Sequence, residues 1–110
     1  MTQALLVLTN LPDAASAEAL AHELVRQRLA ACVNILPAVK SVYRWQGALE
    51  QAGETMLLIK TGAARYEALQ AAIRAAHPYE VPEIIALPIA AGLPAYLDWI
   101  AQQSAAEVKT

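Results

Sequence analysis

The spacing of apolar residues predicts a strand followed by a helix at the start of the chain. The apolar run Ala4–Asn10 is short and ends in turn residues, as a buried strand does. After Pro12, apolar residues recur every three or four positions, and Asp13 or Ser16 can cap an amphipathic helix there. The expected buried face of this helix comprises Ala17, Leu20, Ala21, Leu24 and Val25.

The next region alternates as extended chain does and predicts a long hairpin. Its first strand begins near Val33, and Gln46-Gly47 is the expected turn. Pro37 should kink this strand or lie at a sheet edge, because proline has no N–H to donate. The returning strand starts at Ala48, with an interruption expected at Ala52-Gly53.

On that returning strand, Met56, Leu58 and Lys60 share one face, because successive side chains alternate. We expect this face to point inward, which makes a lysine at its end unusual. A second amphipathic helix is predicted over residues 63–76, with a final strand over 83–90.

Pro94 then suits the first position of a third helix, over residues 94–103. This helix is expected to bury Tyr96, Leu97 and Ile100. Residues 102–110 extend from the end of this helix as an expected tail that frays.

The order β-α-β-β-α-β-α predicts a ferredoxin-like α+β fold, a mainly antiparallel sheet with two helices on one face. One short helix cannot cover the other face. The composition points the same way: 57% of residues are hydrophobic and the mean hydropathy is +0.35. Such a chain of 110 residues, a single domain over 1–110, is expected to bury surface in a homo-oligomer.

Charge and cysteine content exclude several classes of protein. The net charge is −2 and the basic residues are scattered, which argues against a nucleic-acid partner. No apolar run is long enough for a membrane helix, and the first ten residues lack the features of a signal peptide. We therefore expect a cytoplasmic protein. The one cysteine, Cys32, is interpreted as a small core residue.

The segment "HPYEVPEI" (77–84) concentrates polar chemistry in an aliphatic chain. One interpretation is mechanical, since its two prolines end the second helix and stiffen the entry to the last strand. The other is a ligand cleft built from His77, Tyr79, Glu80 and Glu83. In extended chain the two glutamates leave opposite faces, which argues against a shared-proton pair.

Several motifs together resemble the CutA family of divalent-cation tolerance proteins: "ACVN" (31–34), "YRWQG" (43–47), "KT" (60–61), "HPYEVPE" (77–83) and "YLDWI" (96–100). The similarity extends from about Leu6 to Ile100. It implies a ferredoxin-like subunit in a PII-like homotrimer that acts by binding and not as an enzyme. It also implies a cleft between subunits that Trp45 and Lys60 join, with His77, Tyr79 and Glu83.

Metal binding is the property for which that family is named, and copper or zinc would be the ion. His77, Glu80 and Glu83 are the candidate ligands, but they make a sparse set. Related proteins often carry two adjacent histidines before the Pro-Tyr pair, whereas Ala76 precedes His77 here. A structural or signalling scaffold that anchors a partner protein, without a physiological metal site, is the alternative.

Overall fold

The computed structural model describes residues 3–106, and its four strands and three α-helices follow the predicted order. The strands are β1 (Ala4–Leu11), β2 (Cys32–Trp45), β3 (Ala48–Gly62) and β4 (Ile85–Pro88). The helices are α1 (Ala14–Arg26), the short 3-10 helix η1 (Ala63–Arg65), α2 (Tyr66–Ala76) and α3 (Pro94–Gln103).

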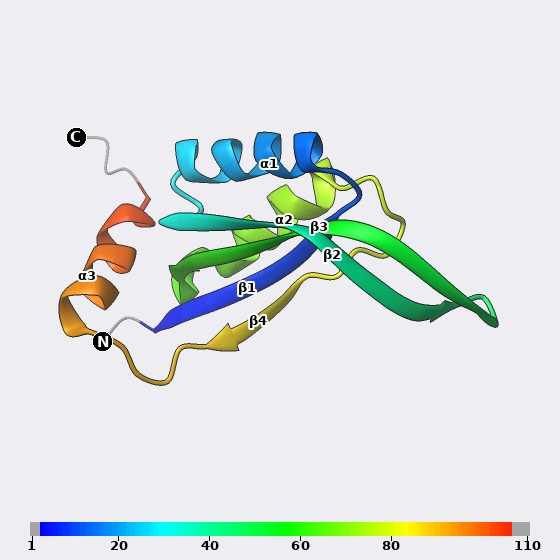
Figure 1. Ribbon diagram of the computed structural model, residues 1–110. Coiled ribbons are helices and arrows are strands. Elements are labelled where there is room, and N and C mark those ends of the chain that lie inside the picture. Colours follow the sequence, from blue (N-terminus) through cyan, green and yellow to red (C-terminus); the bar gives the residue numbers. More distant parts are fainter. Residues whose placement is uncertain (1–2, 107–110) are drawn as a thin grey trace.

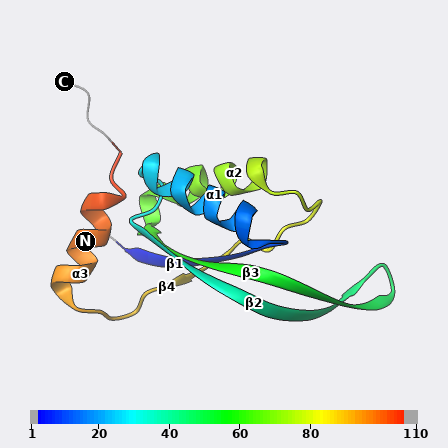
Figure 2. The ribbon, with the colours of Figure 1, turned by 45° about the horizontal axis from the view of Figure 1, so that its top comes forward.

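The four strands form one antiparallel sheet in the order β2-β3-β1-β4. Both α1 and α2 cover the same face of this sheet, while α3 lies at one end (Figure 1). Figure 2 shows the opposite face free of helices along most of its length. We call this the open face. The ferredoxin-like α+β fold with a C-terminal helix is confirmed.

The β2–β3 hairpin extends well beyond the rest of the sheet (Figure 1). Pairing between β1 and β3 ends at Leu11 and Thr55, and β2 alone pairs with β3 from there to the turn. We call residues 39–54 the arm. Its turn is at Gln46 and Gly47, where φ is 49° and 82°. Positive φ at both turn residues matches the right-handed twist of the two strands.

A single apolar core joins α1 and α2 to the covered face of the sheet. Val7, Leu57 and Ile59 are fully buried there. From the helices, Leu20, Leu24, Leu69 and Ile73 meet them. The helical period thus predicted the buried residues of α1, apart from Val25, which is 43% exposed. Val25 lies one position past Leu24, so it is turned away from the sheet.

Cys32 and Tyr96 are also less buried than predicted. Cys32 is only half-buried, because its position at the start of β2 places it on the open face beside Lys60. Tyr96 is 39% exposed and stacks on Trp99, so α3 buries mainly Ile100. Pro94 stands in the first turn of α3 as predicted.

The irregularity in the hairpin lies in β2 and not, as predicted, in β3. β3 is continuous through Ala52 and Gly53, which pair with β2. The register shifts between Leu36 and Val39, where Ala38 has φ of 59°. The kink predicted at Pro37 is therefore confirmed. A bulge beside a proline removes the ladder bond that the proline could not make.

The inward face of β3 is the opposite of the predicted one. Thr55, Leu57 and Ile59 are buried against the helices, so Met56, Leu58 and Lys60 lie on the open face. The Lys60 ammonium donates to Asn34 Oδ1 at 2.7 Å and lies 5.9 Å from the centre of the Tyr96 ring. The ammonium group therefore has its two partners, the Asn34 side chain and the Tyr96 ring, at the α3 end of the sheet.

The expected tail is ordered where it can be described. Gln102 and Gln103 complete α3, and the buried Ser104 donates to the Ile100 carbonyl and accepts from the Gly62 amide. Residues 107–110 lie outside the described part of the chain.

Candidate functional site

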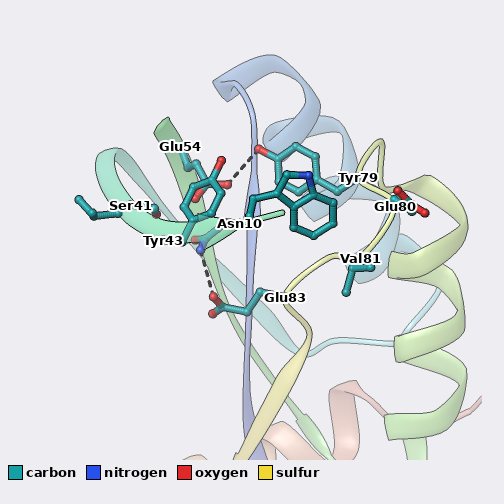
Figure 3. Close-up of a pocket in the computed structure, with 10 residues that line it drawn as sticks. Asn10, Ser41, Tyr43, Glu54, Tyr79, Glu80, Val81 and Glu83 are labelled. Carbon is teal, nitrogen blue, oxygen red and sulfur yellow. Dashed lines mark hydrogen bonds between the residues drawn. The ribbon is translucent and has the colours of Figure 1, made fainter. Parts of the chain in front are cut away.

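A hollow of about 580 Å³ lies where the arm leaves the sheet, facing the segment between α2 and β4. We call that segment, residues 77–84, the connector. The hollow is lined by the end of β1, by the arm and by the connector (Figure 3). Three elements far apart in sequence therefore build one site.

His77 fixes the first residue of the connector to the end of β1. It caps α2 with extended backbone and is 8% exposed. The ring nitrogen Nδ1 accepts from the Tyr79 amide at 3.2 Å, so Nε2 carries the proton and donates to the Asn10 carbonyl at 2.6 Å. Both ring nitrogens are thus engaged within the chain.

Tyr79 follows, and its ring and hydroxyl connect the connector to the arm. The ring packs against His77 with centroids 4.7 Å apart. Its hydroxyl donates to Glu54 Oε2 at 2.9 Å, as Figure 3 shows. Partial burial, together with this bond to a carboxylate, raises the pKa of Tyr79 to about 12. The phenol is therefore a neutral donor across the physiological range of pH.

Glu83 closes the other side of the hollow. Asn10 Nδ2 donates to Glu83 Oε1 at 3.4 Å, a long bond (Figure 3). Asn10 is 7% exposed, and its Oδ1 has no hydrogen-bond partner. Glu80 also lines the hollow, and its carboxylate points away from Glu83 in Figure 3.

The structure brings together most, but not all, of the predicted cleft residues. Trp45, Tyr79, Glu80 and Glu83 line the hollow. His77 does not line it. Its ring instead bonds the Asn10 carbonyl and so fixes the connector to the end of β1.

Lys60 is not at the hollow within one chain, and its place in a cleft between subunits stays a prediction. It pairs with Leu6, whereas the hollow begins at Asn10, which pairs with Met56. Four residues of strand separate the two places, about 13 Å. The strand end that carries Lys60 is the end beside α3.

Sequence reasoning also missed Asn10, Tyr43 and Glu54, which line the same hollow. The available signal was the hairpin itself. With the turn at Gln46-Gly47, Tyr43 and Trp45 alternate onto one side of the arm. No local pattern connects Glu54 to Tyr79, because their contact depends on how the connector crosses the sheet.

A strong metal centre does not fit the residues of one chain. In residues 3–106, no group of three or more His, Cys, Asp or Glu side chains could hold an ion. The nitrogens of His77 are already occupied by backbone groups. An ion at Glu80 or Glu83 would need further ligands from another subunit.

No helix within residues 3–106 is long and apolar enough to cross a membrane.

The chain was compared with known proteins. The sequence pattern of the CutA1 divalent ion tolerance protein family matches residues 5–103. The divalent-cation tolerance protein CutA of Thermus thermophilus is 47% identical over 98 residues, which is 89% of this chain and 95% of that protein. The crystal structure of CutA from Xylella fastidiosa matches with a TM-score of 0.90 at 45% identity, over 93% of this chain and 98% of that one.

A third similar structure, CutA1 from Oryza sativa, has a TM-score of 0.90 at 39% identity and covers 96% of both chains. The similarity thus spans β1 to α3, including the arm and the connector. The family is one of ion tolerance proteins and not of enzymes. On the combined match of sequence and fold, the chain belongs to the CutA1 divalent ion tolerance protein family.

Proposed function

We propose that this protein is a homotrimeric binding protein that holds a ligand in the hollow and catalyses no reaction. The observation that carries this proposal is the hollow itself: about 580 Å³, lined by three carboxylates and three aromatic side chains. Hollows of this size suit small molecules. The carboxylates are Glu54, Glu80 and Glu83, and the aromatic residues are Tyr43, Trp45 and Tyr79.

The trimer is supported by the family and by the open face. CutA proteins are trimers. In this chain the open face presents apolar side chains with no cover, among them Ile85 and Leu87, which are 50% and 47% exposed. Exposed apolar side chains grouped on one face are typical of a subunit interface. In a trimer, the neighbouring subunit would also be close enough to complete the hollow.

The divalent cation of the family name enters this proposal as a ligand of the trimer, with copper and zinc as the candidates. Glu80 and Glu83 are the donors that remain accessible. To bind the ion at Nδ1, His77 would have to give up the hydrogen bond that it accepts from the Tyr79 amide, which makes it a poor ligand.

Calorimetric titration of the trimer tests the proposal. The titrants are Cu²⁺, Zn²⁺ and small organic cations, anions and neutral compounds. The protein is the wild type, the double variant Glu54→Gln/Glu83→Gln, or the control Glu67→Gln. Glu67 is exposed at the start of α2, away from the hollow. Binding that the double variant loses and the control keeps supports a site in the hollow. If no titrant behaves in this way, the proposed function is wrong.

A scaffold that anchors a partner protein is the second candidate function. It is favoured by the poor fit of a metal to the described residues and by the exposed Tyr96–Trp99 stack on α3. Affinity capture in the presence of a chelator tests it. A partner retained in stoichiometric amount, and lost from a Trp99→Ala variant, supports a scaffold.

The cytoplasm is the compartment that we propose. Relatives carry other locations in their names, namely chloroplastic in Arabidopsis thaliana and periplasmic in Archaeoglobus fulgidus. Fractionation of the producing cells, with the protein detected by antibody, distinguishes these compartments.

A further inference from the structure

The charge of the hollow points to one class of ligand. None of the ten residues that line it is a lysine, arginine or histidine, while Glu54, Glu80 and Glu83 contribute three carboxylates. The only ion pair within residues 3–106 is Arg26–Glu23 on α1, so these three carboxylates are not neutralised by the chain. A concave surface of one sign concentrates ions of the opposite sign. The hollow therefore attracts cations and repels anions.

Its aromatic walls favour an organic cation. Tyr43, Trp45 and Tyr79 are 43%, 42% and 38% exposed, although large aromatic side chains usually gain by burial. An aromatic face beside a carboxylate binds an alkylammonium or guanidinium group through both charge and the ring quadrupole. A bare metal ion uses the carboxylate but gains little from the rings.

The groups of the hollow that remain free to form hydrogen bonds are acceptors, so a matching ligand carries hydrogen-bond donors. Tyr79 already gives its hydroxyl proton to Glu54, and Asn10 gives an N–H to Glu83. The remaining oxygens of both carboxylates can only accept. Asn10 Oδ1 is a further acceptor, buried and without a partner. Because the Asn10–Glu83 bond is long, a cation at Glu83 can replace it and let the carboxamide turn its oxygen toward the hollow.

We infer that the hollow binds a small organic cation, a molecule that carries an alkylammonium or guanidinium group. This inference rests on the ligand-binding function proposed above and names the class of that ligand. The cationic group lies between Glu54 and Glu83, where Asn10 also contributes an acceptor. The aliphatic part of the ligand packs on Tyr43, Trp45 and Tyr79.

Titration with compounds of matched length tests the inference. Cadaverine, pentanediol and glutarate share a chain of the same length and carry positive, zero and negative charge, and agmatine adds a guanidinium group. Phosphate buffer is used, since amine buffers are themselves organic cations. Light-scattering mass and thermal melting confirm that each variant is folded and assembled.

Cadaverine or agmatine should bind the wild type, with an affinity that falls as salt is added. The double variant Glu54→Gln/Glu83→Gln should raise their Kd by at least about tenfold, because charge-assisted hydrogen bonds are lost. Glu67→Gln should leave the Kd unchanged. Pentanediol and glutarate should not bind.

Other outcomes overturn the inference in distinguishable ways. Binding of glutarate or pentanediol, dependent on Glu54 and Glu83, would contradict the cationic class and leave the ligand-binding function standing. If cadaverine or agmatine binds the Lys40→Gln or Arg44→Gln variant but not the wild type, a basic side chain of a neighbouring copy occupies the hollow. The inference that the hollow binds a free organic cation would then be wrong. Absence of binding by all four compounds, while Cu²⁺ or Zn²⁺ binds, would also reject the organic class.

Discussion

At the scale of single residues, Tyr79 provides the most direct check on the geometry of the hollow. Its pKa is raised to about 12 by burial and by its bond to Glu54. Titration of tyrosine absorbance with alkali should therefore show a late step near pH 12 that is absent from Tyr79→Phe. Glu54→Gln should move this step to lower pH by part of the shift, because burial remains. An unchanged step in Glu54→Gln would contradict the contact.

The same shift predicts how stability depends on pH. The pKa of Tyr79 is raised above its ordinary value of 10 on folding. The folded state therefore binds the phenolic proton more tightly than the unfolded state does. This contribution to the free energy of unfolding is complete below pH 10 and is lost as pH rises to about 12. Denaturant melts should show a smaller loss of stability over this range in Tyr79→Phe than in the wild type.

His77 is the residue whose role changes most between sequence and structure. As an exposed imidazole it would be a metal ligand, but its two nitrogens fix the connector to Asn10 and Tyr79. His77→Ala leaves a buried carbonyl without its donor and should lower the free energy of unfolding by about 2 kcal/mol or more. Denaturant melts measure this loss.

His22→Ala is the matched control for that prediction. His22 is exposed on α1, so its removal should change stability little. A His77→Ala variant of unchanged stability that loses copper or zinc binding would contradict the structural role and restore His77 as a ligand.

At the scale of elements, the hairpin turn depends on one glycine in particular. Gly47 has φ of 82°, where a side chain is strained even though the surrounding space is open. Gly47→Ala should therefore destabilise the arm by about 1 kcal/mol. Hydrogen exchange of the Trp45 and Ala48 amides, beside the turn, reports this loss directly.

Gly53→Ala provides the comparison within the same hairpin. Gly53 also has open space around it, but its φ is not in the left-handed region. Alanine there should be neutral or slightly stabilising, since it restricts the unfolded chain. Equal effects of the two substitutions would show that the turn does not have the conformation described.

The elements themselves were largely predictable from sequence, because helices and turns depend on local chemistry. Residue type placed the N-cap of α1 at Asp13 or Ser16, and the structure has it at Asp13, whose side chain accepts from the Ser16 amide. The orientation of β3 was predicted wrongly, because Leu57 and Ile59 on one face are no more apolar than Met56 and Leu58 on the other. The available signal was Lys60, whose charge favours placing the face of Met56 and Leu58 away from the helices.

The candidate site was only half predictable for a related reason. The connector is one continuous segment, and its residues stood out from the aliphatic sequence around them. Asn10 and Glu54 enter the hollow through the register of β1 with β3 and through the length of the arm. Within one chain Lys60 lies at the other end of β3, because a strand has two ends and the sequence does not say which of them faces the connector. Its place in a cleft between subunits stays a prediction.

At the scale of the whole molecule, the sheet has helices on only one of its faces, and this explains the apolar composition. The covered face is complete within one chain, whereas the open face leaves half-buried and exposed apolar residues from β1, β3 and β4. The long arm extends beyond the rest of the sheet (Figures 1 and 2). Assembly would cover the open face and bring neighbouring chains close to the hollow.

The final prediction concerns that assembly and uses two exposed apolar residues of similar exposure. Leu87 on the open face is 47% exposed and Val25 on the outer side of α1 is 43% exposed. A lysine at Leu87 would place a charge in the proposed interface, where its desolvation is costly. Leu87→Lys should therefore shift the mass measured by light scattering from trimer toward monomer, while Val25→Lys should remain a trimer. If Leu87→Lys retains the trimer mass and Val25→Lys loses it, the helices and not the open face form the interface. The hollow would then be bounded by one chain alone, and its ligand would bind with the same affinity to a monomer.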